Sequence, residues 1–495
     1  MSVCICGAGL AGTMAAALLA QRGFEVDVYE KRPAPDLDEE GKTDVAQSAL
    51  KRSINLALSQ RGMEALAAVG LLDKAMESAI RMPCRVIHQE GASHAIKQPY
   101  GKPHEAIHSV SRQLLNALLL QKARSSSLVR FHFGHTLVSA GRDGTCVFRN
   151  DDASSASASS EQQLVQERFD LVIGADGAYS GVRESMLRQD RVSFSRAYIA
   201  HGYKELNIPA KAGPDGKPCF ALADHEGLHI WPRGAFMLIA LPNPDCSFTA
   251  TLFAPFSGPD GFNYVDENSA EEVKAYFQRR FPDVVPLIPD VVREFRDNPV
   301  GSLMTIRVDP WNVGSLLLVG DAAHAVVPFF GQGMNAAFED CLMLDEYVES
   351  HLKALSASSS SAPASASASA SVKAQSVAAL RAAAQQLAQE RRPAANALAD
   401  LCIEHYSDMA ANTASTWYLA QKRVEAALHW LFPSSFVPLY TMVAFTRTPY
   451  HEAVARHERQ ERVARAVLSF SAVALTAGGF AAWSAWAWGS RRTRL

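Results

Sequence analysis

The stretch that decides the fold is LLLVGDAAHAVVPFFGQGMN, residues Leu316–Asn335. Leu316–Val319 is an apolar run typical of a buried strand, and Gly320–Asp321 ends it at the place where an open α/β sheet binds its ligands. We therefore predict that this aspartate faces a hydroxyl group of a bound ligand. A glycine-rich turn, Gly331–Asn335, then brings backbone N–H groups toward the ligand before a helix over Ala336–Val348. Taken alone, the pattern also fits an ordinary helix N-terminus with tight-turn glycines.

The N-terminus carries a dinucleotide-binding glycine pattern between a predicted strand and a predicted helix, as this motif requires. Val3–Cys6 is typical of a short strand, GAGLAG at Gly7–Gly12 of a tight turn, and Thr13–Gln21 of an alanine-rich helix. A second strand, Glu25–Tyr29, ends in Glu30, about 20 residues after the turn, where an acid can bind ribose hydroxyls. An acid at this position favours an unphosphorylated ribose, and therefore FAD or NAD over NADP.

A third strand-end motif lies in the middle of the chain, where the apolar run Phe169–Gly174 is followed by Asp176–Gly177 and a helix. Three strands that end in glycine and an acid are best explained if they surround one extended ligand. Lys31 and Arg32 follow the acid of the first motif and either contact a phosphate or adenine of that ligand or are solvated charges.

The composition is that of an ordinary globular protein. Of its 495 residues, 48% are hydrophobic and 20% are charged, enough for a large core in two closely packed domains. A net charge of −3 without a basic run argues against nucleic acid as a partner. The eight cysteines are scattered without zinc-ligand spacing, so we expect reduced thiols and no metal site. Nothing after Met1 resembles a signal peptide.

One arginine stands out within an apolar strand. Arg81–Glu90 is typical of a strand, and Arg85 lies inside it. A buried guanidinium group is costly unless it is paired. Arg85 therefore either pairs with a structural carboxylate or binds an anionic ligand, and the pattern alone leaves both possibilities open.

The order and spacing of GxGxxG, Asp176–Gly177 and Gly320–Asp321 resemble the single-component flavoprotein aromatic hydroxylases. Longer strings are similar to those of the kynurenine 3-monooxygenase family. They are RSINLALSQRG from Arg52, HGY at His201–Tyr203, LHIWPR at Leu228–Arg233, GDAAHAVVPFFGQGMNAAFEDC from Gly320 and PLYTMVAF at Pro438–Phe445. The resemblance extends from Val3 to His451, apart from insertions.

This resemblance implies an FAD enzyme that takes electrons from NADPH, which docks transiently without a Rossmann domain of its own. The implied reaction is the O2-dependent hydroxylation of L-kynurenine to 3-hydroxykynurenine through a flavin hydroperoxide, a step of tryptophan degradation. The cofactor carries the chemistry, so the protein has to position the substrate and exclude water, and no catalytic side chain is expected.

The residue pattern and the resemblance together assign a site to each ligand. The FAD site comprises Gly7, Gly9, Ala11, Gly12, Tyr29, Glu30, Lys31, Arg32, Ala57, Arg112, Leu137, Asp176, Asp321, Gly333, Met334 and Asn335. The substrate site comprises Arg85, Tyr100 and Tyr440, which match the family's carboxylate-binding positions, together with Phe329, His405 and Met409.

His405 departs from the family pattern, which has an asparagine before Tyr406. An imidazole can donate a hydrogen bond as an asparagine does, and beside a carboxylate it can also become protonated. Met409 follows one turn later on the same helix face. The alternative is a rotated helix that leaves His405 on the surface.

The predicted fold class is α/β: a Rossmann-like FAD-binding domain interleaved with a β-sheet substrate domain, a C-terminal helical cap and one C-terminal transmembrane helix. The FAD-binding domain takes residues 1–195, with a substrate-contacting strand at 81–101, and residues 301–352. The substrate sheet takes 196–300, where Ile230, Phe236 and Phe248 either cover the substrate ring or belong to the sheet core. A serine- and alanine-rich linker at 353–376 precedes a cap at 377–455, with helices over Val377–Arg391, Pro393–Asn412 and Ser415–Leu431.

Residues 466–489 carry no charge and are rich in alanine, leucine, valine and tryptophan. At about 1.5 Å per residue, a helix of this length reaches about 36 Å and can cross a hydrocarbon core of about 30 Å. Trp483, Trp486 and Trp488 fit an interfacial belt, and arginines flank both ends. We expect a membrane anchor, which the resemblance places in the mitochondrial outer membrane; a buried core helix is the alternative.

Two other classes of function stay open at this point. A flavin reductase that acts on a lipid double bond would suit the fold and an anchor, but it needs a long apolar tunnel in place of Arg85 and Tyr100. A membrane-anchored scaffold that keeps FAD only for stability is the second alternative. Substrate-dependent oxidation of NADPH separates the three functions.

Overall fold

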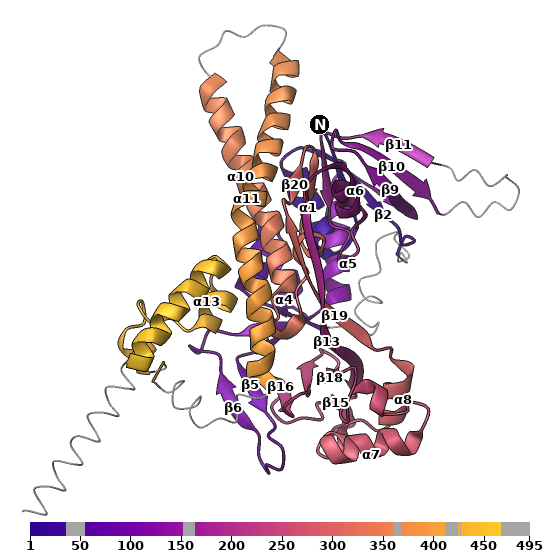
Figure 1. Ribbon diagram of the computed structural model, residues 1–495, viewed down its shortest axis with the longest axis vertical. Helices are drawn as coiled ribbons and strands as arrows, with labels where there is room; N and C mark the ends of the chain where they lie inside the picture. Colours follow the sequence, from indigo (N-terminus) through magenta and orange to yellow (C-terminus); the bar gives the residue numbers. More distant parts are fainter. Residues whose placement is uncertain (36–54, 152–163, 360–367, 411–423, 426, 467–495) are drawn as a thin grey trace, which may run out of the picture.

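The computed structural model describes residues 1–35, 55–151, 164–359, 368–410, 424–425 and 427–466. Its N-terminal part is built on a six-stranded sheet with the order β20-β21-β12-β1-β2-β8, in which every pair is parallel except β20 with β21 (Figure 1). The strands are β1 (Ser2–Cys6), β2 (Glu25–Glu30), β8 (Val129–Phe133), β12 (Leu171–Gly174), β20 (Asn312–Val313) and β21 (Leu316–Leu318). The three predicted strand-end motifs therefore follow three neighbouring strands, β1, β12 and β21.

The second large sheet has seven strands in the order β19-β13-β18-β17-β16-β5-β6. Its strands are β5 (Cys84–Ile87), β6 (Ile96–Pro99), β13 (Ser193–Ile208), β16 (Gly227–Pro232), β17 (Met237–Pro242), β18 (Phe248–Pro255) and β19 (Gly301–Asp309). β5 and β6 join this sheet although they lie within the predicted FAD-binding segment. β19 also belongs to it, because it pairs with β13, so the sheet extends past the predicted boundary at residue 300.

Three small sheets complete the β structure. They are formed by β9 (His135–Ala140), β10 (Thr145–Asn150) and β11 (Leu164–Arg168); by β3 (Asn55–Leu58), β4 (Ile80–Met82) and β7 (Ile107–Ser111); and by β14 (Lys211–Ala212) and β15 (Pro218–Cys219).

The helices among the described residues are α1 (Leu10–Gln21), α3 (Gln60–Ala68), α4 (Leu72–Met76), α5 (Arg112–Arg124), α6 (Gly181–Gln189), α7 (Ala270–Arg280), α8 (Val291–Asp297), α9 (Asp321–His324), α10 (Gly333–Ser359), α11 (Ala368–Ala410), a short helix over 427–431, α13 (Leu439–Phe445), the 3-10 turns η1 (Phe262–Tyr264), η2 (Val285–Leu287) and η3 (Pro328–Phe330), and a last helix over 450–466.

The seven-stranded sheet uses its two faces differently. Phe248 and Leu252 of β18 point to one side, where they pack against Phe277 of α7 and Phe295 of α8 in one buried cluster. Phe253 points to the other side, toward η3, α11 and α13. Since side chains alternate along a strand, one face is filled by helices and the other remains available for a ligand.

Two long helices, α10 and α11, lie side by side and project beyond the sheets (Figure 1). The structure corrects the prediction here: α10 continues to Ser359 and α11 starts at Ala368, so helix occupies both ends of the predicted linker at 353–376. It also corrects the break expected before Pro393, which lies inside α11. Proline removes one intrahelical hydrogen bond, but buried residues on both sides of it, such as Leu387 and Leu398, keep the helix packed.

The prediction of a C-terminal transmembrane helix is wrong for this structure, because no helix among the described residues is long and apolar enough to cross a membrane. Of the predicted span 466–489, only residue 466 belongs to the described part, at the end of the last helix, and residues 467–489 lie outside it. The expected location in the mitochondrial outer membrane therefore has no support from the described residues.

A buried ion network joins α10, α11 and the end of β21. The Asp340 carboxylate accepts hydrogen bonds from Gly320 N at 3.0 Å, His324 Nε2 at 2.5 Å and Arg391 Nε at 2.8 Å. Arg391 also contacts Glu339 at 2.6 Å, and Glu339 accepts from Arg61 Nη1 at 2.5 Å. Burial alone would raise the pKa of Asp340, but His324 and Arg391 hold it below its ordinary value.

We predict that Arg391→Met lowers the free energy of unfolding by about 3–5 kcal/mol, because Glu339 and Asp340 would be left as buried carboxylates without this cation. Arg392→Met is the matched control, since Arg392 pairs with Asp309 at the surface with 35% of its side chain exposed; we expect a loss of at most about 1 kcal/mol. Urea unfolding followed by circular dichroism measures both, and equal losses would contradict the dominant role of the buried network.

Candidate active site

One continuous cavity of about 930 Å³ connects the ends of the six-stranded sheet with the open face of the seven-stranded sheet. This is at the upper end of the usual size of ligand pockets. The predicted site residues that line it are Gly7, Gly9, Ala11, Tyr29, Glu30, Lys31, Arg32, Ala57, Arg85, Arg112, Leu137, Asp176, Asp321, Phe329, Gly333, Met334 and Tyr440. Residues of both predicted sites thus face the same cavity, although Tyr100 and His405 are not among its lining residues and the Met409 side chain lies outside the described part.

The glycine turn after β1 has the shape of a dinucleotide cradle. Gly7 N donates to Tyr29 O at 2.7 Å, which ties the turn to β2. A Cβ on Gly12 would lie 1.9 Å from Gly7 O, so only glycine allows α1 to start so close to the turn. A Cβ on Gly9 would meet no atom within 4 Å and would enter the cavity. The N-terminus of α1 therefore faces open space suited to a pyrophosphate.

Glu30 ends β2 at the rim of this cradle. Its Oε2 accepts from Ala8 N at 2.8 Å, and its Oε1 accepts from the Arg32 backbone N–H and from Arg32 Nε, both at 2.9 Å. Burial would raise the pKa of Glu30, but the hydrogen bonds from Arg32 and Ala8 keep it below its ordinary value. A charged carboxylate is thus available at the position that binds ribose hydroxyls in dinucleotide folds.

Asp176 and Asp321 lie at the ends of the two neighbouring strands. Asp321 is the exposed first residue of α9 and faces the cavity. Asp176 Oδ2 accepts from Gly181 N at 2.7 Å, so it caps α6, while its Oδ1 is buried and has no hydrogen-bond partner among the described residues. Burial raises the pKa of Asp176. The buried Oδ1 of Asp176 can accept a hydrogen bond from a hydroxyl group of a ligand. The acids at these two strand ends therefore fit the hydroxyl-bearing part of FAD.

Two predicted cofactor residues do not line the cavity. Gly12 lies under the turn, as described above. Asn335 is fully buried, where its Nδ2 donates to Ala57 O at 2.8 Å and Gly331 O at 2.9 Å and its Oδ1 accepts from Ser59 N at 2.9 Å. Asn335 thus holds the glycine-rich turn against β3, and we propose that it acts on the cofactor through the backbone around Ala57.

Arg112 brings a positive charge to the middle of the cavity. It is the first residue of α5, whose N-cap Ser111 accepts from Leu114 N at 3.3 Å. Among the described residues Arg112 forms no ion pair, and Glu205 of β13 lines the same cavity. Burial raises the pKa of Glu205 and the charge of Arg112 counteracts it. Sequence reasoning missed Glu205, because an acid in a long strand is usually solvated.

The far end of the cavity gathers a cation and several aromatic rings. Arg85, on β5, lies with its Cζ 4.8 Å from the ring centre of Tyr440 and 5.4 Å from that of Tyr100. The two tyrosine rings stack at 4.7 Å. Phe330 stacks on Tyr440 at 5.5 Å, and Phe329 beside it lines the same wall. Burial raises the pKa of both tyrosines, so each keeps its hydroxyl proton for donation.

His405 joins this cluster although it does not line the cavity. Its Nε2 lies 3.1 Å from Arg85 Nη2, and its ring lies 4.5 Å from that of Phe330. A guanidinium can only donate, so Nε2 must accept, and the imidazole is neutral in this geometry. The geometry thus places His405 behind Arg85 and does not favour the charged imidazolium considered above. Met409 lies in the last turns of α11, and its side chain is outside the described part.

The open face of the seven-stranded sheet forms the remaining wall. Its side chains are Leu228, Met237, Ile239, Leu241, Thr249, Thr251 and Phe253. For three residues the sequence left open whether they cover the substrate ring or belong to the sheet core. Phe236 and Phe248 lie in the core on the opposite face, and Ile230 is buried beneath the wall without lining it. The alternation of Thr249, Thr251 and Phe253 with Phe248 and Leu252 could have shown which face is partly polar.

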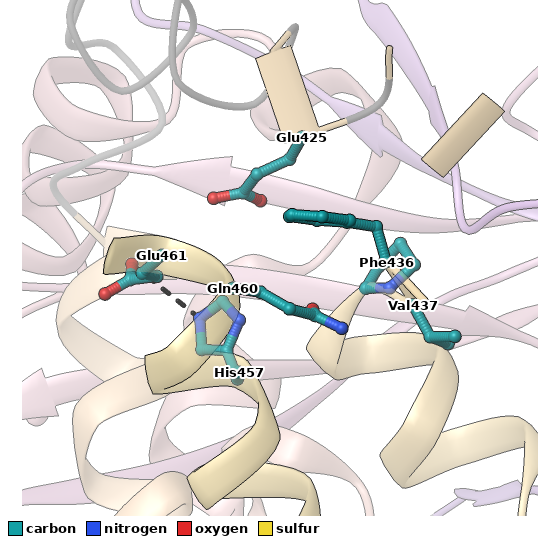
Figure 2. Close-up of a pocket in the computed structure, with 7 residues that line it drawn as sticks. Glu425, Phe436, Val437, His457, Gln460 and Glu461 are labelled. Carbon is teal, nitrogen blue, oxygen red and sulfur yellow. Dashed lines mark ion pairs between the residues drawn. The ribbon is translucent and has the colours of Figure 1, made fainter. Parts of the chain in front are cut away.

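A second cavity, between the chain before α13 and the last helix, is much smaller. Its volume is about 10 Å³, room for about one water molecule. Figure 2 shows its lining, with His457 Nε2 and Glu461 Oε1 3.7 Å apart. The residues are Glu425, Phe436, Val437, Pro438, His457, Gln460 and Glu461. It cannot hold an organic substrate, so the large cavity is the candidate active site.

We predict that Gly9→Val yields a folded protein without flavin, because the added Cβ would meet no protein atom within 4 Å and the side chain would project into the cradle. Flavin absorbance per mole of protein after gel filtration measures the loss. Gly12→Ala is the comparison, since its Cβ would clash with Gly7 O and should lower the urea midpoint as well. Full flavin content in Gly9→Val would contradict the position of the pyrophosphate.

Comparisons with known proteins agree with this site. Residues 1–369 match the family model described as FAD binding domain. Kynurenine 3-monooxygenase of Salinispora arenicola is 41% identical over 470 residues, which cover 94% of this chain and 92% of that protein. Kynurenine 3-monooxygenase of Sus scrofa is 37% identical over 474 residues, covering 95% and 89%, respectively.

Among solved structures, the tetrameric form of 2-methyl-3-hydroxypyridine-5-carboxylic acid oxygenase aligns with a TM-score of 0.61, covering 86% of this chain and 95% of that one. At 19% sequence identity, it shows the fold alone. The family model and the full-length relatives show more: FAD is the cofactor, and this chain belongs to the kynurenine 3-monooxygenase family of FAD-dependent monooxygenases.

Proposed function

We propose that this chain hydroxylates L-kynurenine to 3-hydroxykynurenine, with NADPH as electron donor and O2 as oxygen donor. Family membership supports the reaction. The structural observation that carries the proposal is the continuity of the cavity, which joins the dinucleotide cradle at Gly9 and Glu30 to the cationic end at Arg85. An amino acid with an aromatic ring has the charge and shape for that end.

The cationic end suits the amino-acid part of the substrate. Arg85 can donate to the carboxylate, and the hydroxyls of Tyr100 and Tyr440 stay protonated and can donate beside it. His405 keeps Arg85 in place through the 3.1 Å contact. A lipid would need an apolar tunnel in place of these groups, so the geometry favours kynurenine over a lipid double bond.

The apolar wall suits the aromatic ring. Ile239, Leu241 and Phe253 face the cavity from β17 and β18, with Phe329 opposite at 5.1 Å from Phe253. Thr249 and Thr251 supply hydroxyls on the same wall. A ring held there lies between the sheet face and η3, where protein atoms replace water around it. Exclusion of water protects a reactive intermediate from side reactions.

FAD, when bound, supplies the two-electron chemistry and the activation of oxygen. The overall reaction consumes L-kynurenine, NADPH, a proton and O2, and it releases 3-hydroxykynurenine, NADP+ and water. The chain's own part is to hold the dinucleotide through the strand-end groups of β1, β12 and β21, to orient the substrate by its carboxylate, and to exclude water.

The proposed reaction can be tested directly. Purified protein incubated with L-kynurenine and NADPH in air should yield a product heavier by one oxygen atom in mass spectrometry, and isotopically labelled O2 should label it. NADPH oxidation should rise when kynurenine is added. Kynurenine-independent oxidation without an oxygenated product would contradict the proposal and favour a reductase.

We predict that Arg85→Met raises the KM for kynurenine roughly 10-fold or more, because a charge-assisted hydrogen bond contributes about 1.5–3 kcal/mol and about 1.4 kcal/mol corresponds to a factor of ten. Flavin content should not change. Arg81→Met, an exposed arginine on β4 that donates to Pro103 O, is the matched control with an unchanged KM.

A second substitution tests the role of His405. His405→Asn should keep the KM within about threefold, since an amide oxygen can also accept from Arg85, whereas His405→Leu should raise it toward the Arg85→Met value. Steady-state kinetics at saturating NADPH measure both. Equal KM values for His405→Leu and the unmodified chain would remove this histidine from the substrate site.

A further inference from the structure

One tyrosine outside the cavity connects three elements that form or support its walls. Tyr406 lies in the last turns of α11, and its hydroxyl donates to Ala235 O at 2.7 Å, in the turn between β16 and β17. Its ring centre is 4.4 Å from that of Phe329 on η3, and the ring of His201 on β13 lies edge-on at 4.9 Å. Tyr406 is half-buried and does not line the cavity. Its ring and its hydroxyl therefore contact different elements, which fixes it in one place.

The carbonyl of Ala235 is held by two donors. Besides the Tyr406 hydroxyl, His201 Nε2 donates to Ala235 O at 3.0 Å. A carbonyl oxygen only accepts and has two lone pairs, so both contacts form together and His201 carries a proton on Nε2. Phe236, the next residue, lies in the core on the opposite face of the sheet, and its carbonyl accepts from Arg233 N at 3.0 Å. The turn is therefore fixed from α11, from β13 and from the sheet core.

The ring of Tyr406 supports one cavity wall from behind. Phe329 lines the cavity, and its ring centre is 5.1 Å from that of Phe253 on the sheet face. Met237 starts β17 directly after the turn and lines the same cavity. The hydroxyl of Tyr406 thus bonds to the turn that carries the sheet wall, while its ring packs against the residue that forms the opposite wall. The contact between Tyr406 and Ala235 therefore sets the spacing between the two walls.

We propose that Tyr406 is a positioning residue for the hydroxylation, and that its hydroxyl keeps Phe329 and the β16–β17 wall close enough to enclose an aromatic ring without water. The inference rests on the proposed function, because the ring is that of the substrate. Water that enters a reaction cavity opens side reactions. Here the side reaction consumes NADPH, a proton and O2 and releases NADP+ and hydrogen peroxide. The ratio of hydrogen peroxide to 3-hydroxykynurenine therefore measures how well the walls are closed.

The test compares Tyr406→Phe with Tyr347→Phe in the FAD-loaded enzyme. Tyr406→Phe keeps the ring against Phe329 and removes only the donor to Ala235 O. Tyr347→Phe is the matched control, since this half-buried tyrosine of α10 donates to Glu390 Oε2 at 2.5 Å and neither residue lines the cavity. We expect the ratio of hydrogen peroxide to 3-hydroxykynurenine to rise about 3- to 10-fold in Tyr406→Phe, the equivalent of one ordinary hydrogen bond, and to stay unchanged in Tyr347→Phe.

Two further measurements separate positioning from binding. The KM for kynurenine and the flavin content should not change in Tyr406→Phe, since the groups around Arg85 and the dinucleotide cradle are untouched. A raised KM with an unchanged product ratio would assign Tyr406 to substrate binding and overturn the proposal. An unchanged product ratio with an unchanged KM overturns it as well, and so does an equal rise in Tyr347→Phe.

Hydrogen exchange tests the role of the turn without catalysis. Mass spectrometry of peptides that span residues 233–236 should show faster amide exchange in Tyr406→Phe than in the unmodified chain, and no change in Tyr347→Phe. A changed product ratio with unchanged exchange in the turn would contradict the route through Ala235. If the unmodified chain forms no 3-hydroxykynurenine, the proposed function fails, whereas the exchange result still tests the turn.

A substitution of the second donor tests the same carbonyl independently. His201→Phe keeps a ring beside Tyr406 and removes the hydrogen bond from Nε2 to Ala235 O. We expect it to raise the product ratio and to speed up exchange in the turn, as Tyr406→Phe does. A product ratio that changes in neither variant would show that the position of Ala235 does not matter to the reaction.

Discussion

The buried carboxylate of Asp340 is the contact on which the arrangement of this molecule depends. It receives a backbone N–H from the end of β21, an imidazole from α9 and a guanidinium from α11, while it stands on α10 itself. A charge this deep is tolerated only when every side of it is satisfied. Four elements therefore have to meet at one point, and their meeting fixes where β21 stops and where Asp321 begins to face the cavity. Buried Asp340 thus sets the position of Asp321, which faces the cavity, although Asp340 itself does not line the cavity.

The two large sheets contribute to the cavity by different principles. The six-stranded sheet offers its strand ends, where the backbone turns and the acids Glu30, Asp176 and Asp321 follow apolar strands. The seven-stranded sheet offers a face, where every second side chain points inward and its neighbours enter the opposite core. A polar cofactor fits strand ends rich in N–H groups, whereas an aromatic ring fits a flat wall. The shared cavity brings both kinds of surface within reach of one reaction.

The parts that could be predicted from sequence are those that short-range pattern determines. The strand that ends in Glu30, the open space at Gly9 and the acid at Asp321 follow from local rules about strands, glycines and helix starts, and the structure places all three at the cavity. The sequence left open which face of β18 Phe248 occupies, because neighbouring residues such as Phe248 and Thr249 point to opposite faces and the sheet register decides which face is which. Glu205 was missed because an isolated charge in a strand follows no sequence pattern. The helical ends of the serine- and alanine-rich segment, up to Ser359 and from Ala368, were missed because its composition was read as that of a linker.

The membership of β5 in the second sheet has a consequence for how the chain matures on the ribosome. β5 pairs with β16, with Arg85 beside Leu228, and β12 in the other sheet pairs with β21, with Val172 beside Leu316. Translation adds roughly 5–20 residues per second, and N-terminal segments emerge first. The strand that carries Arg85 therefore lacks its partner strand β16 until more than a hundred further residues have been made. The seven-stranded sheet is complete only after β19, which ends at Asp309, and the six-stranded sheet only after β21, which ends at Leu318. Until then both sheets present unpaired edges, which attract other strands. Nascent chains of this protein thus expose unpaired strand edges over a long interval of synthesis, and this is the interval in which we expect chaperones to bind them.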